Sequence, residues 1–126
     1  MRRLVIRPYP TLAAVLDALG SGVSTSQWTG RRLHYCSKDN QDISSLEQLG
    51  LGRAIPGTEF LSALPNLAIV IDGEFTATDA EGRPWVILNA VDTTWFEVTS
   101  ADPAVYAAIK SRFEAVEEQS SDGPAA

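Results

Sequence analysis

Two carboxylates, Glu74 and Glu97, could act as a general acid and a general base if the fold brought them together. Both lie in stretches that alternate between apolar and polar side chains, which predicts antiparallel strands. If the strand containing Asn89 separates them, their backbones lie about 10 Å apart, at two strand spacings. Catalytic carboxylate pairs of glycosidases lie about 5–9.5 Å apart. The spacing does not exclude catalysis, but two carboxylates on one sheet are common, and we favour a structural or binding role.

His34 and Cys36 are two residues apart on a predicted strand, where an imidazole could in principle activate a thiol. The sequence indicates neither a third residue to orient the histidine nor an oxyanion hole. One His and one Cys also cannot supply the four ligands of a structural zinc site. We therefore interpret them as structural residues and assign no catalytic residue, no metal ligand and no cofactor.

Two loop segments contain residue types that can bind ions or phosphates. Asp39, Asn40 and Asp42 lack the spacing of an EF-hand loop. Residues 50–57 contain three glycines, but they do not match G-x-G-x-x-G, and no Gly-Lys-Ser/Thr follows. We interpret the first segment as a solvated turn and the second as a loop connection.

The dipeptide Asp72-Gly73 is typical of a two-residue type I′ hairpin turn. Taken as a turn, it predicts a four-stranded antiparallel meander over about residues 67–99. Such a turn also fixes the register, because a one-residue slip would move every side chain to the other face. The predicted pairs include Val70–Phe75, Thr78–Trp85, Glu74–Asn89, Asn89–Glu97 and Leu88–Val98.

This register separates two faces of the meander. The first has no polar side chain and is the predicted core face: Ala68, Val70, Phe75, Ala77, Val86, Leu88, Ala90, Phe96 and Val98. The second is mixed: Ile69, Ile71, Glu74, Thr76, Thr78, Trp85, Ile87, Asn89, Val91, Trp95, Glu97 and Thr99. Tryptophan beside polar groups is typical of interaction surfaces. The candidate partner-binding residues are Glu74, Trp85, Ile87, Asn89, Trp95 and Glu97.

An alternative is that the first 60 residues fold over the mixed face and bury it. Those residues must bury their own apolar side chains, such as Leu12, Leu16 and Trp28. A partly covered face with a groove lies between the two interpretations.

The other segments predict a single α+β domain over residues 1–118. A helix begins after Thr11 and ends at Gly20, and a last helix of about residues 103–117 is capped by Asp102 and covers the core face. The remaining predictions are an edge strand at 3–7, a strand at 32–36, short helical segments at 44–49 and 57–64, and a disordered tail at 119–126.

The chain of 126 residues has a formal net charge of −6, unevenly distributed. Residues 1–38 carry six basic side chains against one acidic, and residues 39–126 carry four basic against fifteen acidic. An acidic surface disfavours general nucleic-acid binding and attracts basic partners. Alternatively, the basic N-terminal part pairs with the acidic part inside one monomer.

Composition also bears on compartment and class. One cysteine suits a reducing compartment, and no apolar run is long enough to cross a bilayer, so we expect a cytoplasmic protein without membrane contact. The first functional hypothesis is a small protein-binding module, such as an inhibitor, an immunity-type protein or an adaptor. The alternatives are a dimer similar to secretion chaperones, and a small-molecule-binding protein or small enzyme with a pocket over the mixed face.

Overall fold

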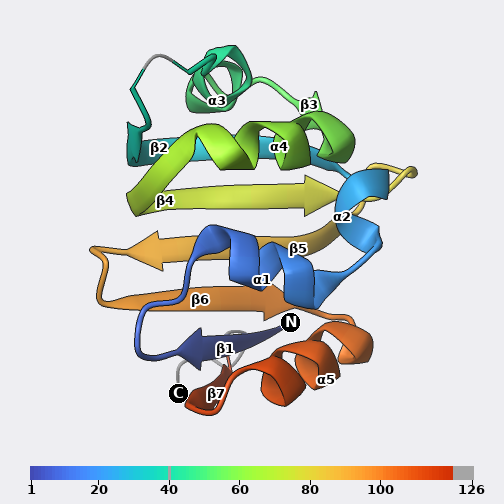
Figure 1. Ribbon diagram of the computed structural model, residues 1–126. Coiled ribbons are helices and arrows are strands. Elements are labelled where there is room, and N and C mark those ends of the chain that lie inside the picture. The colour runs from blue at the N-terminus through green and yellow to red at the C-terminus, as the bar shows by residue number, and fades with distance from the viewer. Residues whose placement is uncertain (40, 121–126) are drawn as a thin grey trace.

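The computed structural model describes residues 1–39 and 41–120 and contains one seven-stranded sheet with helices (Figure 1). All neighbouring strands are antiparallel, in the order β3-β2-β4-β5-β6-β1-β7. The strands are β1 (Arg2–Ile6), β2 (Gln27–Ser37), β3 (Ile55–Pro56), β4 (Leu67–Thr78), β5 (Pro84–Val91), β6 (Trp95–Ser100) and β7 (Val116–Ser120). The helices are α1 (Leu12–Leu19), α2 (Gly22–Thr25), α3 (Ser44–Gly50), α4 (Gly57–Ala63) and α5 (Pro103–Arg112), with a 3₁₀ turn η1 (Leu64–Asn66). The predicted α+β class is confirmed.

The helices gather on one side of the sheet (Figure 1). Leu16 of α1, Phe60 of α4 and Ile109 of α5 are fully buried in one cluster with the predicted core face. Within that face only Ala68 is exposed. The alternative in which residues 1–60 cover the mixed face is wrong, because their apolar side chains pack on the same side as α5.

Local capping explains the two best-defined helices. The Thr11 hydroxyl accepts a hydrogen bond from the Ala14 amide, and Gly20 ends α1 with φ of 77°. The Asp102 carboxylate accepts from the Ala104 amide, and Pro103 occupies the first helical position of α5. These side chains satisfy backbone groups that the first and last turns leave without a partner, and both predicted helix starts are confirmed.

The predicted hairpin at Asp72-Gly73 is wrong, and the meander has three strands rather than four. Strand β4 continues through both residues and pairs with β2 from Leu67 to Thr78, with Asp72 opposite His34. A Cβ atom at position 73 would lie 3.1 Å from the Leu33 Cα, and Gly73 has φ of 146°. The glycine is therefore required for close approach of a neighbouring strand, not for a turn.

The register downstream of Gly73 is confirmed except at one position. Trp85 was predicted to face Thr78, but Thr78 pairs with Pro84, because a β-bulge inserts Trp85 as an extra residue. Such a bulge redirects the side chain at the insertion. The confirmed pairs are Glu74–Asn89, Phe75–Leu88, Ala77–Val86, Leu88–Val98, Asn89–Glu97 and Ala90–Phe96.

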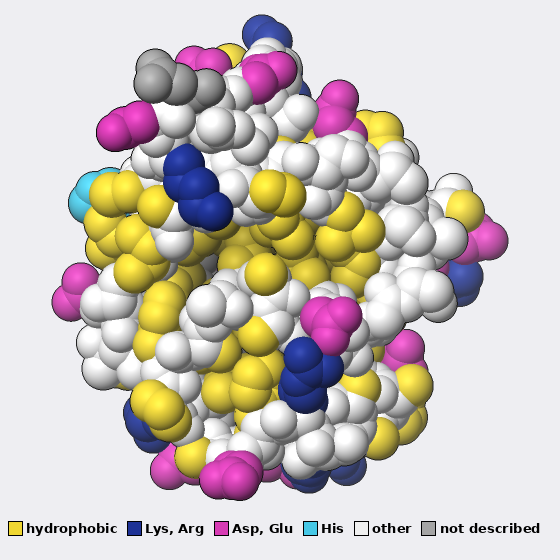
Figure 2. All heavy atoms as spheres, in the orientation of Figure 1, with side chains coloured by type: hydrophobic (Ala, Val, Ile, Leu, Met, Phe, Trp, Pro, Cys, Tyr) yellow, Lys and Arg dark blue, Asp and Glu magenta, His cyan; other side chains and the backbone are white. Residues whose placement is uncertain are grey.

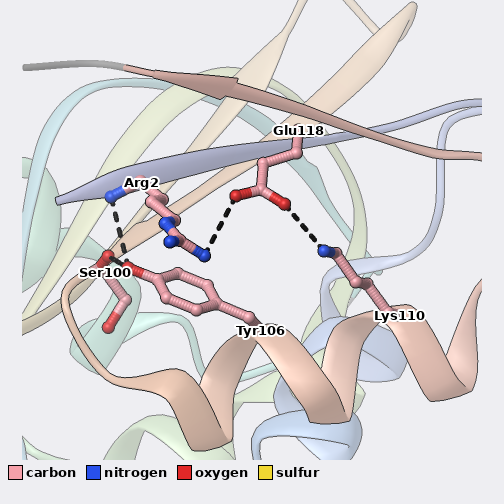
Figure 3. A network of polar contacts seen from close by, with 5 residues as sticks. All are labelled: Arg2, Ser100, Tyr106, Lys110 and Glu118. Carbon is pink, nitrogen blue, oxygen red and sulfur yellow. Dashed lines mark hydrogen bonds and ion pairs between the residues drawn. The ribbon is translucent and has the colours of Figure 1, made fainter. Parts of the chain in front are cut away.

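The last helix ends at Arg112, five residues before the predicted end, and the chain then forms strand β7. Acidic side chains are unfavourable at a helix C-terminus, whereas in β7 Glu118 meets Arg2 and Glu117 meets Arg7. Glu118 lies between Arg2, at 3.2 Å, and Lys110, at 2.7 Å (Figure 3). Residues 119 and 120 belong to β7, and 121–126 of the predicted tail lie outside the described residues.

Strand β1 was predicted at an edge of the sheet, and this is also wrong. It pairs with β6 on one side and β7 on the other, so that Val5 lies between Glu97 and Glu117. Four arginines of the basic N-terminal part face acids of the later chain: Arg2–Glu118, Arg3–Glu97, Arg7–Glu117 and Arg31–Glu74. Internal pairing of the two charged parts is thus confirmed for these residues.

Candidate functional site: the open face of the sheet

The side of the sheet opposite the helices, here called the open face, carries residues from six strands. The cross-strand pairs place Glu74, Asn89, Glu97, Val5 and Glu117 in one row. A parallel row contains Thr29, Thr76, Ile87, Thr99, Arg3 and Gln119. Arg31, which pairs with Glu74, and the cross-strand pair Val91–Trp95 lie on the same face.

Glu97 is the centre of a polar network on the open face. Its carboxylate accepts hydrogen bonds from the Asn89 amide at 3.4 Å and from the Trp95 indole at 2.9 Å. The Arg3 guanidinium lies 3.9 Å away, and the Glu97 side chain is 17% exposed. Several partners hold this half-buried carboxylate, so Trp95 and Asn89 are fixed in orientation.

Trp95 is covered on one side by an arginine. The Arg7 guanidinium lies 5.2 Å from the centre of a Trp95 ring, in a cation–π contact. The same guanidinium lies 2.7 Å from the Glu117 carboxylate, and Arg3 donates to the Gln119 side chain at 3.0 Å. Arg3 and Arg7 therefore connect the β6 part of the network with β7.

The two candidate catalytic carboxylates lie on the same face but do not form a pair. Glu74 and Glu97 are separated by Asn89 of β5. Each has its own cation, since Glu74 lies 3.9 Å from Arg31 and Glu97 lies 3.9 Å from Arg3. The arrangement is that of two separately compensated side chains, which suits binding better than proton transfer.

A hollow of about 370 Å³ indents the open face where β2 is irregular. The register of β2 against β4 shifts after Arg31, and Arg32 adopts φ of 53°. Arg31, Glu74 and Asn89 line this hollow together with Asp72 and Val91. Charges of both signs therefore border it.

Five of the six candidate partner-binding residues lie on the open face, and Trp85 does not. The bulge turns Trp85 to the helix side, where its indole donates to Asp102 at 3.1 Å and its ring lies against Gly22. The five that share the face are Glu74, Ile87, Asn89, Trp95 and Glu97, and all are half-buried.

The sequence reasoning missed the arginines of this face, Arg3, Arg7 and Arg31. A signal for two of them was present, because Arg3, Val5 and Arg7 alternate along the first strand and must share one side. Arg31 was missed because the strand was predicted to begin at residue 32, whereas β2 begins at Gln27 and pairs Arg31 with Glu74 in regular register.

The two other sets of candidate residues are less well placed for chemistry. His34 and Cys36 are both exposed on β2, with a register irregularity between them. The Asp42 carboxylate accepts hydrogen bonds from the hydroxyl and amide of Ser44, the first residue of α3, and these hydrogen bonds lower the pKa of its carboxyl group. Asn40 lies outside the described residues. Within residues 1–39 and 41–120, no three His, Cys, Asp or Glu side chains gather into a metal site.

The helix side carries an apolar groove. Figure 2 shows hydrophobic side chains gathered between α4 and α1 on this side of the molecule. A groove of about 370 Å³ is lined there by Thr11, Leu12, Ala13, Lys38, Leu64, Pro65, Leu67, Ala68, Ile69 and Val70. Within the described part of the chain, no helix is long and apolar enough to span a membrane.

Comparison with known proteins does not assign a family. The chain matches no protein-family model, no curated protein and no solved structure. Functional inference therefore rests on the open face and on the clefts at the ends of the sheet.

Proposed function

We propose that this chain is a small protein-binding module, of the inhibitor, immunity-type or adaptor kind, whose open face contacts the partner. The observation that supports the proposal most is the placement of the helices on one side, which leaves a broad sheet face with half-buried side chains. Trp95 and Arg3 are among them, and the exposed Arg7 and Arg31 lie on the same face. Tryptophan and arginine are enriched at the energetic centres of protein interfaces.

The polar network favours binding because it orders the surface in advance. Trp95 is held by Glu97 and stacked under Arg7. A surface whose side chains are already fixed loses less conformational entropy when a partner docks. The arrangement thus supports a preformed contact surface.

Charge suggests how a partner would be attracted. The open face is itself balanced, since Arg3, Arg7 and Arg31 face Glu74, Glu97 and Glu117. The excess of acid in the chain, a net −6, lies elsewhere on the surface. We therefore propose a basic partner whose encounter is accelerated by the overall field, with a contact patch that is mixed rather than strongly basic.

A self-associated form is the second candidate. A face with equal numbers of Arg and Glu side chains can pair with a second copy of itself, as a two-fold interface requires. Light scattering on the purified protein distinguishes a dimer from a monomer. A dimer that Ile87→Arg converts to a monomer supports this candidate.

The central test compares two faces of the molecule in a pull-down from the source cell followed by mass spectrometry. We expect Ile87→Arg and Trp95→Ala to lose a protein that the unchanged chain captures. Leu61→Arg, which places the same charge on α4 at a position 37% exposed, should retain it. The thermal midpoint of each variant must stay near that of the parent.

Retention of the partner by both open-face variants, or its loss in Leu61→Arg alone, contradicts the proposal. A copurifying small molecule instead favours the pocket alternative, with the hollow beside Arg31 as its site.

The exposed free thiol of Cys36 agrees with a reducing compartment, and we propose a cytoplasmic location.

A further inference from the structure

Trp85 lies at a cleft that the open face does not include. The cleft has a volume of about 500 Å³ and opens between α2, the loop from β4 to β5, and the start of α5. A second hollow of about 300 Å³ adjoins it. Trp85, Asp79 and Asp102 line both hollows, so this tryptophan forms the wall between them.

The indole of Trp85 is held in place from two sides. Its Nε1–H donates to the Asp102 carboxylate at 3.1 Å. The edge of its six-membered ring lies against the Gly22 backbone, where a Cβ atom would come within 2.5 Å. Trp85 also packs against the hydrophobic core, and its half-buried side chain lines both hollows. Leu19, Ala80 and Val105 give the larger cleft an apolar lining.

The carboxylates at this cleft exceed the cations. Asp79, Glu81 and Asp102 line it, and Arg83 lies 3.3 Å from Asp79 and 3.4 Å from Glu81. The Asp102 carboxylate accepts hydrogen bonds from the Trp85 indole and from the Ala104 amide. Among the described residues, no Lys, Arg or His forms an ion pair with it. The field in the cleft is therefore negative.

We propose that this cleft binds an aliphatic ammonium group carried on a methylene chain. The ring of Trp85 offers its negative face to the cation, Asp102 and Glu81 provide the opposite charge, and Leu19 and Val105 contact the methylenes. A free amine and the lysine side chain of another protein both present this group. The site uses none of the open-face residues and stands whether or not the open face binds a partner.

The experiment follows the three indole N–H resonances in a ¹⁵N–¹H NMR spectrum, with Trp85→Phe used to assign one of them. Pentylamine and pentanol are added separately, because they have the same chain and differ in charge at neutral pH. We expect pentylamine to shift the Trp85 resonance in a saturable way and to leave those of Trp28 and Trp95 unchanged. Pentanol should shift it far less. Equal shifts by the two compounds overturn the proposal. The absence of a saturable shift both with pentylamine and with the lysine peptide described next also overturns it.

A second arm distinguishes the two sources of the group. A capped glycine–lysine–glycine peptide is compared with a peptide in which norleucine replaces the lysine. Binding of the lysine peptide alone identifies a protein side chain as the ligand, and binding of pentylamine alone identifies a free amine.

Charge variants test which carboxylates act. Glu81→Gln and Asp102→Asn should each weaken amine binding about threefold, the size expected of a partly exposed ion pair. Asparagine keeps an oxygen for the helix cap, so α5 should persist, and Glu81 has an exposed side chain whose replacement should leave the fold intact. Glu114→Gln, the same charge change beyond the far end of α5, should have no effect. Unchanged affinity in both cleft variants contradicts the proposal.

Discussion

The six-membered ring of Trp85 lies so close to the backbone of Gly22 that a methyl group at position 22 would come within 2.5 Å of the ring. The contact joins the segment between α1 and β2 to the bulge at the start of β5. Only glycine allows this approach, since every other residue carries a Cβ atom. The contact thereby positions the wall of the Trp85 cleft.

Replacement of Gly22 by alanine should therefore overpack this contact. We expect Gly22→Ala to destabilise the fold by about 1–3 kcal/mol and to shift the Trp85 indole resonance. Urea unfolding measures the loss of stability, and NMR measures the shift of the indole resonance.

Gly50→Ala is the matched control, because a Cβ at position 50 meets nothing within 4 Å. Alanine near a helix end should leave stability equal or raise it by up to about 1 kcal/mol. Equal stability of the two variants would contradict the close contact.

The continuity of β4 predicts protection from hydrogen exchange across positions 72 and 73. In a hairpin these amides would lie at a solvent-exposed turn, whereas the ladder pairs Gly73 with Ala90 and Asp72 with His34. We expect exchange along residues 70–77 to vary as in one strand, without a minimum of protection at the Asp-Gly step. Rapid exchange confined to these two residues would contradict the continuous strand and support the hairpin that the sequence predicts.

The attachment of β7 should depend on pH. A hydrogen bond from Lys110, and then the charges of Lys110 and Arg2, lower the pKa of Glu118 below its ordinary value of 4.5. A lowered pKa means that the folded state prefers the ionised carboxylate. Its contribution is therefore present above pH 4.5 and is lost as the pH falls through the lower, folded pKa.

We thus expect the amide resonances of residues 116–119 to move toward disordered values at acid pH before those of β5 do. Glu118→Gln should remove most of this difference between the strands. Simultaneous loss of β5 and β7 in the parent protein would argue against a separate role for this carboxylate.

Deprotonation of Tyr9 should lower the stability of the fold at alkaline pH. Burial, and then the charge of Asp72, raise the pKa of Tyr9 to about 12, and its hydroxyl donates to the Val70 carbonyl. A raised pKa means that the folded state retains the proton. The contribution is complete below pH 10 and is lost as the pH rises from 10 toward 12.

Urea unfolding as a function of pH measures this contribution. Tyr9→Phe should be less stable than the parent at neutral pH, because the Val70 carbonyl loses its donor, and should depend less on pH above 10. Tyr35, whose pKa burial also raises, supplies the comparison: Tyr35→Phe should retain the alkaline dependence. An unaltered pH profile in Tyr9→Phe would contradict the assignment.

Local signals in the sequence predicted the parts of the fold that depend on nearby residues. Thr11 and Gly20 mark the two ends of α1 as expected, because capping acts within one helical turn. Glu74, Asn89 and Glu97 share a row because β4, β5 and β6 follow one another through short loops. Alternation then determined the face of each residue.

The errors at Asp72-Gly73 and at the end of the last helix come from contacts between distant segments. Asp72-Gly73 has the composition of a turn, but the approach of Leu33, forty positions earlier, requires the glycine for another reason. The last helix was predicted to continue to residue 117, yet β1 offers residues 116–120 a strand partner that local propensity cannot detect. The bulge that turns Trp85 away from the open face depends on its pairing with β4 and leaves no mark in the sequence.

The position of β1 between β6 and β7 also determines when the sheet can close during synthesis. Residues 2–6 are synthesised long before both of their neighbouring strands, which lie in residues 95–120. Strand β1 therefore stays unpaired, and Leu4, Val5 and Ile6 stay unburied, until almost all of the described chain has emerged from the ribosome. Closure over so long a sequence separation is slow. A nascent chain stalled before residue 95 would expose an apolar strand to aggregation or to a chaperone.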